Sequence, residues 1–166
     1  MPLPHDQKIQ LLGELTHLML CSPLHRGYAV DDIERKFFPA FERKQFRLWR
    51  RKDAMVGLLT WAWLSEEAAA RYGALGLLTK EADWTSGEQL WAIDLIAPFG
   101  DFPMIASELR RLFPGQRYHR LRPPKPGRAL APRQFQNRAA PNDTALYSPH
   151  DRKASPRLKQ SSIRQQ

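Results

Sequence analysis

Two nearly apolar segments constrain the fold of this chain more than any other feature. They are residues 55–64 (MVGLLTWAWL) and 90–99 (LWAIDLIAPF), and runs of this length and composition are typical of buried strands. The segment 46–51 (FRLWRR) alternates polar and apolar residues and is followed by a charged turn. We therefore predict that 46–51 is an edge strand that forms a hairpin with 55–64, and that 90–99 is a third strand beside them.

Helical patterns surround these strands. The sequence predicts an amphipathic helix over about 6–21 that Ser22-Pro23 ends, and a helix that Ser65 caps. The remaining predicted elements are a short helix with Ile33 and Phe37 that Asp31 or Asp32 caps, a new turn opened by Pro39, a helix over 103–113 and a last strand over 118–123. This order predicts an α+β fold with a largely antiparallel sheet flanked by helices.

The basic charge lies in the last third of the chain. Residues 1–116 carry 14 Lys and Arg against 15 Asp and Glu, whereas residues 117–166 carry 12 against 2, a net charge of +10. From about Asn137 onward, the chain is polar with little apolar content, so we predict a domain over 1–136 and a basic, disordered tail over 137–166. A basic segment attracts nucleic acid, membrane or an acidic protein.

Several classes of protein are disfavoured. No segment approaches the roughly 18 consecutive apolar residues of a membrane span. The one cysteine, Cys21, excludes an internal disulfide and fits a reducing, cytoplasmic location. The histidines lack the spacing of metal ligands, so no metal site is expected. Nucleic-acid binding by the basic segment stays an alternative function, although its basic residues alternate with prolines instead of lining a helix or an aromatic platform.

Two polar residues stand out as catalytic candidates. His25 lies just past a predicted helix end, between Pro23 and Gly27, and a loop-borne imidazole suits proton transfer. Asp94 lies inside an apolar strand, where a carboxylate is costly to bury unless it is paired. Its partner could be backbone amides or an arginine, or it could accept the imidazole N–H of His25. Ser22 is three residues from His25, so a serine nucleophile is conceivable.

Four motifs occur in a recognisable order and spacing. They are LGELTHLMLCSPLHR (12–26), WAWLS (61–65), DWTSGEQLWAIDLIAPFGD (83–101) and RLRP (120–123). Over about residues 11–135 the chain resembles the toxin-activating lysine acyltransferases, the hemolysin C-type activators of RTX toxins.

The resemblance implies a fold and an activity. The fold would be similar to the N-acetyltransferase (GNAT) type. The activity would be transfer of a fatty acyl group from acyl carrier protein to internal lysines of an RTX protoxin in the cytoplasm. The donor is then the acylated carrier, with no further cofactor, and a homodimer is compatible with this family. A divergent relative kept only as an inactive interaction module is a further alternative.

The resemblance also implies roles for single residues. It matches the catalytic His and Asp to His25 and Asp94, with His25 either a general base or a transient acyl carrier. Ser22 would hold the His25 loop or polarise the thioester carbonyl. Candidates for an apolar acyl trough are Trp61, Trp63 and Trp91. Candidates for binding the acidic carrier are Arg117, Arg120, Arg122, Lys125 and Arg128, of which Arg122 best matches the family's arginine. The family commonly has a polar residue, Trp and Pro after His-Arg, where this chain has Gly27-Tyr28-Ala29.

Overall fold

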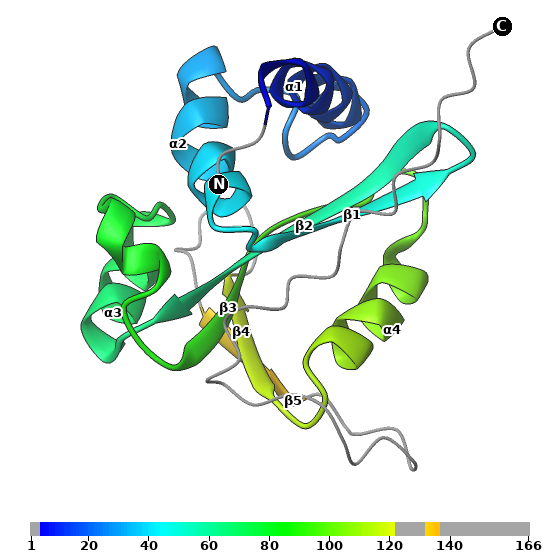
Figure 1. Ribbon diagram of the computed structural model, residues 1–166. Helices are drawn as coiled ribbons and strands as arrows, with labels where there is room; N and C mark the ends of the chain where they lie inside the picture. Colours follow the sequence, from blue (N-terminus) through cyan, green and yellow to red (C-terminus); the bar gives the residue numbers. More distant parts are fainter. Residues whose placement is uncertain (1–3, 122–131, 137–166) are drawn as a thin grey trace, which may run out of the picture.

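The computed structural model describes residues 4–121 and 132–136 of the 166-residue chain. Its helices and strands follow one another in the order that the sequence predicts, with a 3-10 helix and a final strand added (Figure 1). The elements are α1 (His5–Leu20), α2 (Val30–Glu42), β1 (Phe46–Arg51), β2 (Ala54–Leu64), α3 (Glu66–Leu75), the 3-10 helix η1 (Glu81–Trp84), β3 (Gln89–Ile96), α4 (Phe102–Leu112), β4 (Arg117–Leu121) and β5 (Pro132–Gln136).

The five strands form one sheet in the order β1-β2-β3-β4-β5. Every neighbouring pair is antiparallel except β3 and β4, which are parallel. That parallel pairing is short, because only Leu90–Ala92 of β3 pairs with Tyr118–Arg120 of β4. Since β3 continues to Ile96, its last four residues have no partner on β4 within the described part of the chain. Within the described residues, the second half of β3 is therefore paired on one side only, with β2.

Helices cover both faces of the sheet, and apolar residues of the strands alternate between them (Figure 1). One face packs against α1 and α2 through residues such as Leu58 and Ile96, and against α3 through Ala62 and Trp91. The opposite face packs against α4 through Leu59 and other residues of β2 and β3. The predicted α+β fold with a mostly antiparallel sheet is thus confirmed, while the relation to the GNAT type stays a prediction.

Some predicted boundaries are wrong. The helix that follows His25 is continuous from Val30 and contains Pro39, which therefore opens no separate turn. Its N-cap is Ala29, and Asp32 lies in the first turn, where its carboxylate accepts the Ala29 N–H at 2.9 Å. The third strand ends at Ile96 instead of residue 99. The pairing of β5 with β4 was not predicted.

Two further predictions concern the ends of the domain and the membrane. The last described residue is Gln136 of β5, so the tail predicted for 137–166 lies outside the described residues. Of the helices within 4–121, none combines the length and the apolar character that a membrane span requires.

Candidate active site

His25 is held by a tight turn that follows α1. The Ser22 N–H donates to the Met19 carbonyl at 2.9 Å, and the His25 N–H donates to the Ser22 carbonyl at 3.0 Å. The Tyr28 N–H in turn donates to the His25 carbonyl at 3.0 Å. Ser22 and His25 are 6% and 5% exposed, so the imidazole is buried and is carried by a backbone that the turn holds in place.

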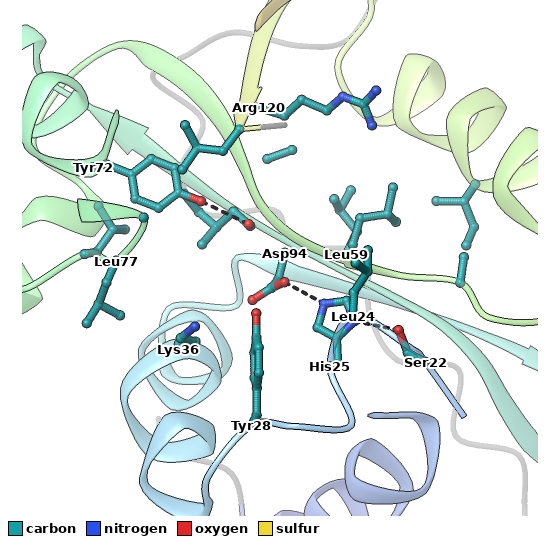
Figure 2. A pocket seen from close by; sticks show the side chains of 18 of the residues that line it. Ser22, Leu24, His25, Tyr28, Lys36, Leu59, Tyr72, Leu77, Asp94 and Arg120 are labelled. Carbon is teal, nitrogen blue, oxygen red and sulfur yellow. Dashed lines mark hydrogen bonds and ion pairs between the residues drawn. The ribbon is translucent and has the colours of Figure 1, made fainter. Parts of the chain in front are cut away.

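Three polar side chains form a hydrogen-bonded row across the sheet face (Figure 2). The Asp94 Oδ1 lies 3.0 Å from His25 Nε2, and the Ser22 hydroxyl lies 2.7 Å from His25 Nδ1. Because a carboxylate only accepts hydrogen bonds, Nε2 carries the proton and Nδ1 accepts from the Ser22 hydroxyl. The predicted contact between His25 and Asp94 is confirmed, and the basic nitrogen of the imidazole is the one that faces Ser22.

Tyr28 forms one wall of this row. Its ring meets the imidazole of His25 edge to face, with centroids 5.3 Å apart, and its hydroxyl points toward Asp94 (Figure 2). The ammonium of Lys36, on α2, lies 4.0 Å from the centroid of the Tyr28 ring. Burial, followed by the carboxylates of Asp94 and Asp32, raises the pKa of Tyr28, so the phenol stays protonated at neutral pH.

The row opens into a cavity of about 750 Å³, a volume typical of small-molecule sites. The cavity lies beside the part of β3 that has no partner on β4, and Ala92 to Leu95 contribute to its wall. Most of its lining is apolar and comes from both sides of the sheet. The lining includes Leu24, Leu59, Leu75, Leu77, Leu78, Trp84, Ile93, Phe102, Ile105 and Leu109.

The three tryptophans predicted for an acyl trough do not line this cavity. Trp61 and Trp63 pack edge to face on Phe113 beneath α4, and Trp91 lies between Tyr72 and the stacked ring of His119. The prediction fails because helices cover both faces of the sheet, and these bulky side chains fill the apolar core on each face instead of lining a cavity. The tryptophan at the cavity is Trp84 of η1.

The predicted basic residues divide into two groups. Arg120 lines the cavity, and its guanidinium lies 6.0 Å from the centroid of Phe102. Arg117 is exposed at the start of β4. The other three, Arg122, Lys125 and Arg128, lie outside the described residues.

Sequence reasoning missed two hydroxyl groups next to Asp94. The Thr60 hydroxyl accepts the Asp94 N–H at 3.1 Å, and the Tyr72 hydroxyl donates to the Ile93 carbonyl at 3.0 Å. Thr60 could have been noticed as the one polar residue inside the apolar segment 55–64. Tyr72 gives no such signal, because an aromatic residue on an amphipathic helix is ordinary core.

The profile of the RTX toxin acyltransferase family (HlyC) matches residues 5–132. The chain belongs to this family. The protein-lysine myristoyltransferase HlyC of Escherichia coli is 36% identical over 118 residues, which cover 70% of this chain and 69% of that relative. The RTX-II toxin-activating lysine-acyltransferase ApxIIC of Actinobacillus pleuropneumoniae is 35% identical over 104 residues, or 63% of this chain and 65% of the relative.

A third relative has a similar match. The leukotoxin-activating lysine-acyltransferase LktC of a Pasteurella haemolytica-like species (strain 5943B) is 35% identical over 103 residues, which cover 61% of this chain and 62% of the relative. The chain thus spans about two thirds of the length of these relatives. The family predicted from the sequence is confirmed, and with it the assignment as an acyltransferase.

Proposed function

We propose that the protein transfers a fatty acyl group from acyl carrier protein to the ε-amine of internal lysines in an RTX protoxin. The observation that carries this proposal is the row Ser22–His25–Asp94 at the wall of an apolar cavity, in a chain of the RTX toxin acyltransferase family. The names of the relatives supply lysine as the acceptor and, for the Escherichia coli protein, myristoyl as the acyl group.

A lysine amine needs a base before it can attack a thioester. With an ordinary pKa of about 10.4, the amine is almost fully protonated at neutral pH. His25 can take this proton at Nδ1, directly once the amine displaces the Ser22 hydroxyl or through that hydroxyl. The neutral nitrogen then attacks the thioester carbonyl, a C–N bond forms and the C–S bond breaks. Of the two protons that the ammonium nitrogen loses in all, one passes through His25 to the departing thiolate and the other is released to solvent.

Asp94 stabilises the charged state of this base. Its carboxylate holds the proton on Nε2 and lies 3.0 Å from the nitrogen that shares the positive charge after proton uptake. The side chain of Asp94 is only 13% exposed, so water screens the pair weakly. We favour His25 as general base over His25 as acyl carrier, because the Ser22 hydroxyl on Nδ1 can relay a proton, whereas it would have to leave before Nδ1 could attack a carbonyl carbon.

The apolar lining of the cavity suits the acyl chain. Each buried methylene group contributes about 0.8 kcal/mol, so an apolar cavity favours a long fatty acyl chain over a short one. Arg120 at the cavity and the exposed Arg117 provide positive charge for an acidic carrier protein.

The test is acyl transfer measured by mass spectrometry of a lysine-containing protoxin, with myristoyl-loaded acyl carrier protein as donor. We expect His25→Ala to abolish transfer, and Ser22→Ala to retain a reduced rate because the amine can reach Nδ1 without the hydroxyl. The control is His17→Ala, which alters an exposed histidine of α1 and should transfer at the normal rate. Full activity of His25→Ala would refute the mechanism, and a Ser22→Ala variant as inactive as His25→Ala would indicate a serine nucleophile.

A further inference from the structure

The strand that carries Asp94 contains a β-bulge directly beside it. The register of β2 against β3 pairs Thr60 with Asp94, and the next residue, Trp61, pairs with Ala92. Ile93 therefore lies between two paired residues without a partner of its own on β2. A bulge of this kind adds one residue to one strand and changes the face to which the following side chains point.

The faces of the flanking residues show what the bulge does. Leu58 and its partner Ile96 both pack against α1 and α2, so Asp94, two residues before Ile96, lies on this same face. Trp91 packs on this side too, in the cluster with α3. Residues three apart in a regular strand point to opposite faces. Without the extra residue, a strand with Trp91 in this position would turn Asp94 toward α4 and away from His25.

Two buried side chains bind the backbone on either side of this bulge. The Thr60 hydroxyl, on β2, accepts the N–H of Asp94 at 3.1 Å. The Tyr72 hydroxyl, on α3, donates to the carbonyl of Ile93 at 3.0 Å, and the bond is visible in Figure 2. These two backbone groups belong to the same peptide unit, the one that joins Ile93 to Asp94.

We infer that Thr60 and Tyr72 are positioning residues for the proposed acyl transfer, because they clamp the Ile93–Asp94 peptide in the bulged form that aims Asp94 at His25. Both side chains are buried, since Thr60 is 0% and Tyr72 is 3% exposed, and each hydroxyl already binds this peptide. Burial, with a smaller contribution from Asp94, raises the pKa of Tyr72, so its hydroxyl stays protonated and remains a donor.

The inference rests on the proposed function for its kinetic readout but not for its spectroscopic one. Thr60→Val removes the hydroxyl and keeps the branched shape, whereas Thr60→Ser keeps the hydroxyl and removes a methyl group. Tyr72→Phe removes the other hydroxyl and keeps the ring that packs on Trp91, with centroids 5.5 Å apart in the native protein. The three variants thus separate the hydrogen bonds from the packing.

The first readout is kinetic. We expect Thr60→Val and Tyr72→Phe each to lower kcat roughly 3- to 10-fold with little change in KM, the factor for one lost hydrogen bond between neutral groups. Thr60→Ser should lie within about twofold of the native rate. In a background of Asp94→Asn, the same two substitutions should change kcat less than about twofold, because residues that act through one group are not additive.

The second readout is the tautomer of His25, followed by ¹⁵N NMR of the imidazole in the full chain. The native protein and Thr60→Ser should show the tautomer with the proton on Nε2 and with Nδ1 unprotonated. The variants Thr60→Val and Tyr72→Phe should show a mixture of the two tautomers. Native rates and a native tautomer in both Thr60→Val and Tyr72→Phe would overturn the inference, as would losses that add fully to that of Asp94→Asn. If the native protein transfers no acyl group, the proposed function fails, and the NMR comparison still decides the role of the clamp.

Discussion

Replacing Asp94 with Asn tests the chemistry of the site with the smallest possible change. The side chain keeps its size, but the negative charge that lies 3.0 Å from His25 Nε2 is lost. If His25 is the base, it gains a positive charge during the reaction, and Asp94 is placed to stabilise that charge. The substitution should therefore lower kcat and leave KM nearly unchanged, because the interaction strengthens only after the substrates have bound.

General magnitudes for a charged hydrogen bond and for an ion pair give two limits for the size of this effect. A hydrogen bond to a charged group contributes about 1.5 kcal/mol at the low end, which corresponds to a factor of about 10 in rate. Two unit charges about 4 Å apart attract by about 4 kcal/mol at the effective dielectric constant of about 20 that suits protein sites, which corresponds to about 10³. We expect kcat of Asp94→Asn to fall between these limits, with the larger losses if the amide nitrogen turns toward the imidazole and shifts the tautomer.

Asp101 provides a matched control. Its side chain is also 13% exposed and is also in an ion pair, with Arg51, but it does not line the cavity. Asp101→Asn should keep kcat within about twofold, since its ion-pair partner is 62% exposed and such pairs contribute at most about 1 kcal/mol to stability. Both variants are assayed as folded protein with acylated carrier and protoxin. An Asp94→Asn variant within threefold of the native kcat would refute the role of Asp94 in stabilising the imidazolium.

Two further predictions concern the carrier and the fold. Arg117→Glu should slow association with acyl carrier protein, most strongly at low salt, because exposed charges are screened beyond a Debye length of about 10 Å at 0.1 M. Stopped-flow measurement of the association rate across a salt series tests this, with Lys52→Glu in the β1–β2 turn as the control. Equal association rates for the two variants would contradict the prediction. Gly87→Ala should destabilise the protein by about 1–3 kcal/mol in urea unfolding, because its Cβ would lie 2.5 Å from backbone atoms of Ser65. Gly73→Ala in α3 meets nothing within 4 Å and should instead stabilise it by about 0.5–1 kcal/mol.

Most of the fold could be predicted from the sequence because its elements follow simple periodic patterns. The helix that Ser65 caps is the clearest case, since the Ser65 hydroxyl accepts the Ala68 N–H at 3.2 Å as its position before an alanine-rich segment predicts. Pro39 misled the prediction because a proline usually opens or breaks a helix. Here α2 continues through it, and Phe37, Ala40 and Phe41 are buried on either side, which indicates that tertiary packing outweighs the missing N–H.

The contact between His25 and Asp94 could be predicted only as a pairing of two unusual residues, and the reason lies in the periodicity of the strand. A strict alternation through Trp91, Ala92, Ile93 and Asp94 places Trp91 and Asp94 on opposite faces. Under that pattern, one of these two side chains would face α4 instead of the side of the sheet that carries His25. The bulge at Ile93 resolves the conflict. The two hydroxyls that bind its backbone come from β2 and α3, and both are distant in sequence from this part of β3. Pattern reasoning along one strand cannot reveal a bulge that residues of other elements hold in place, so the most informative part of this site is also the part that local sequence encodes least.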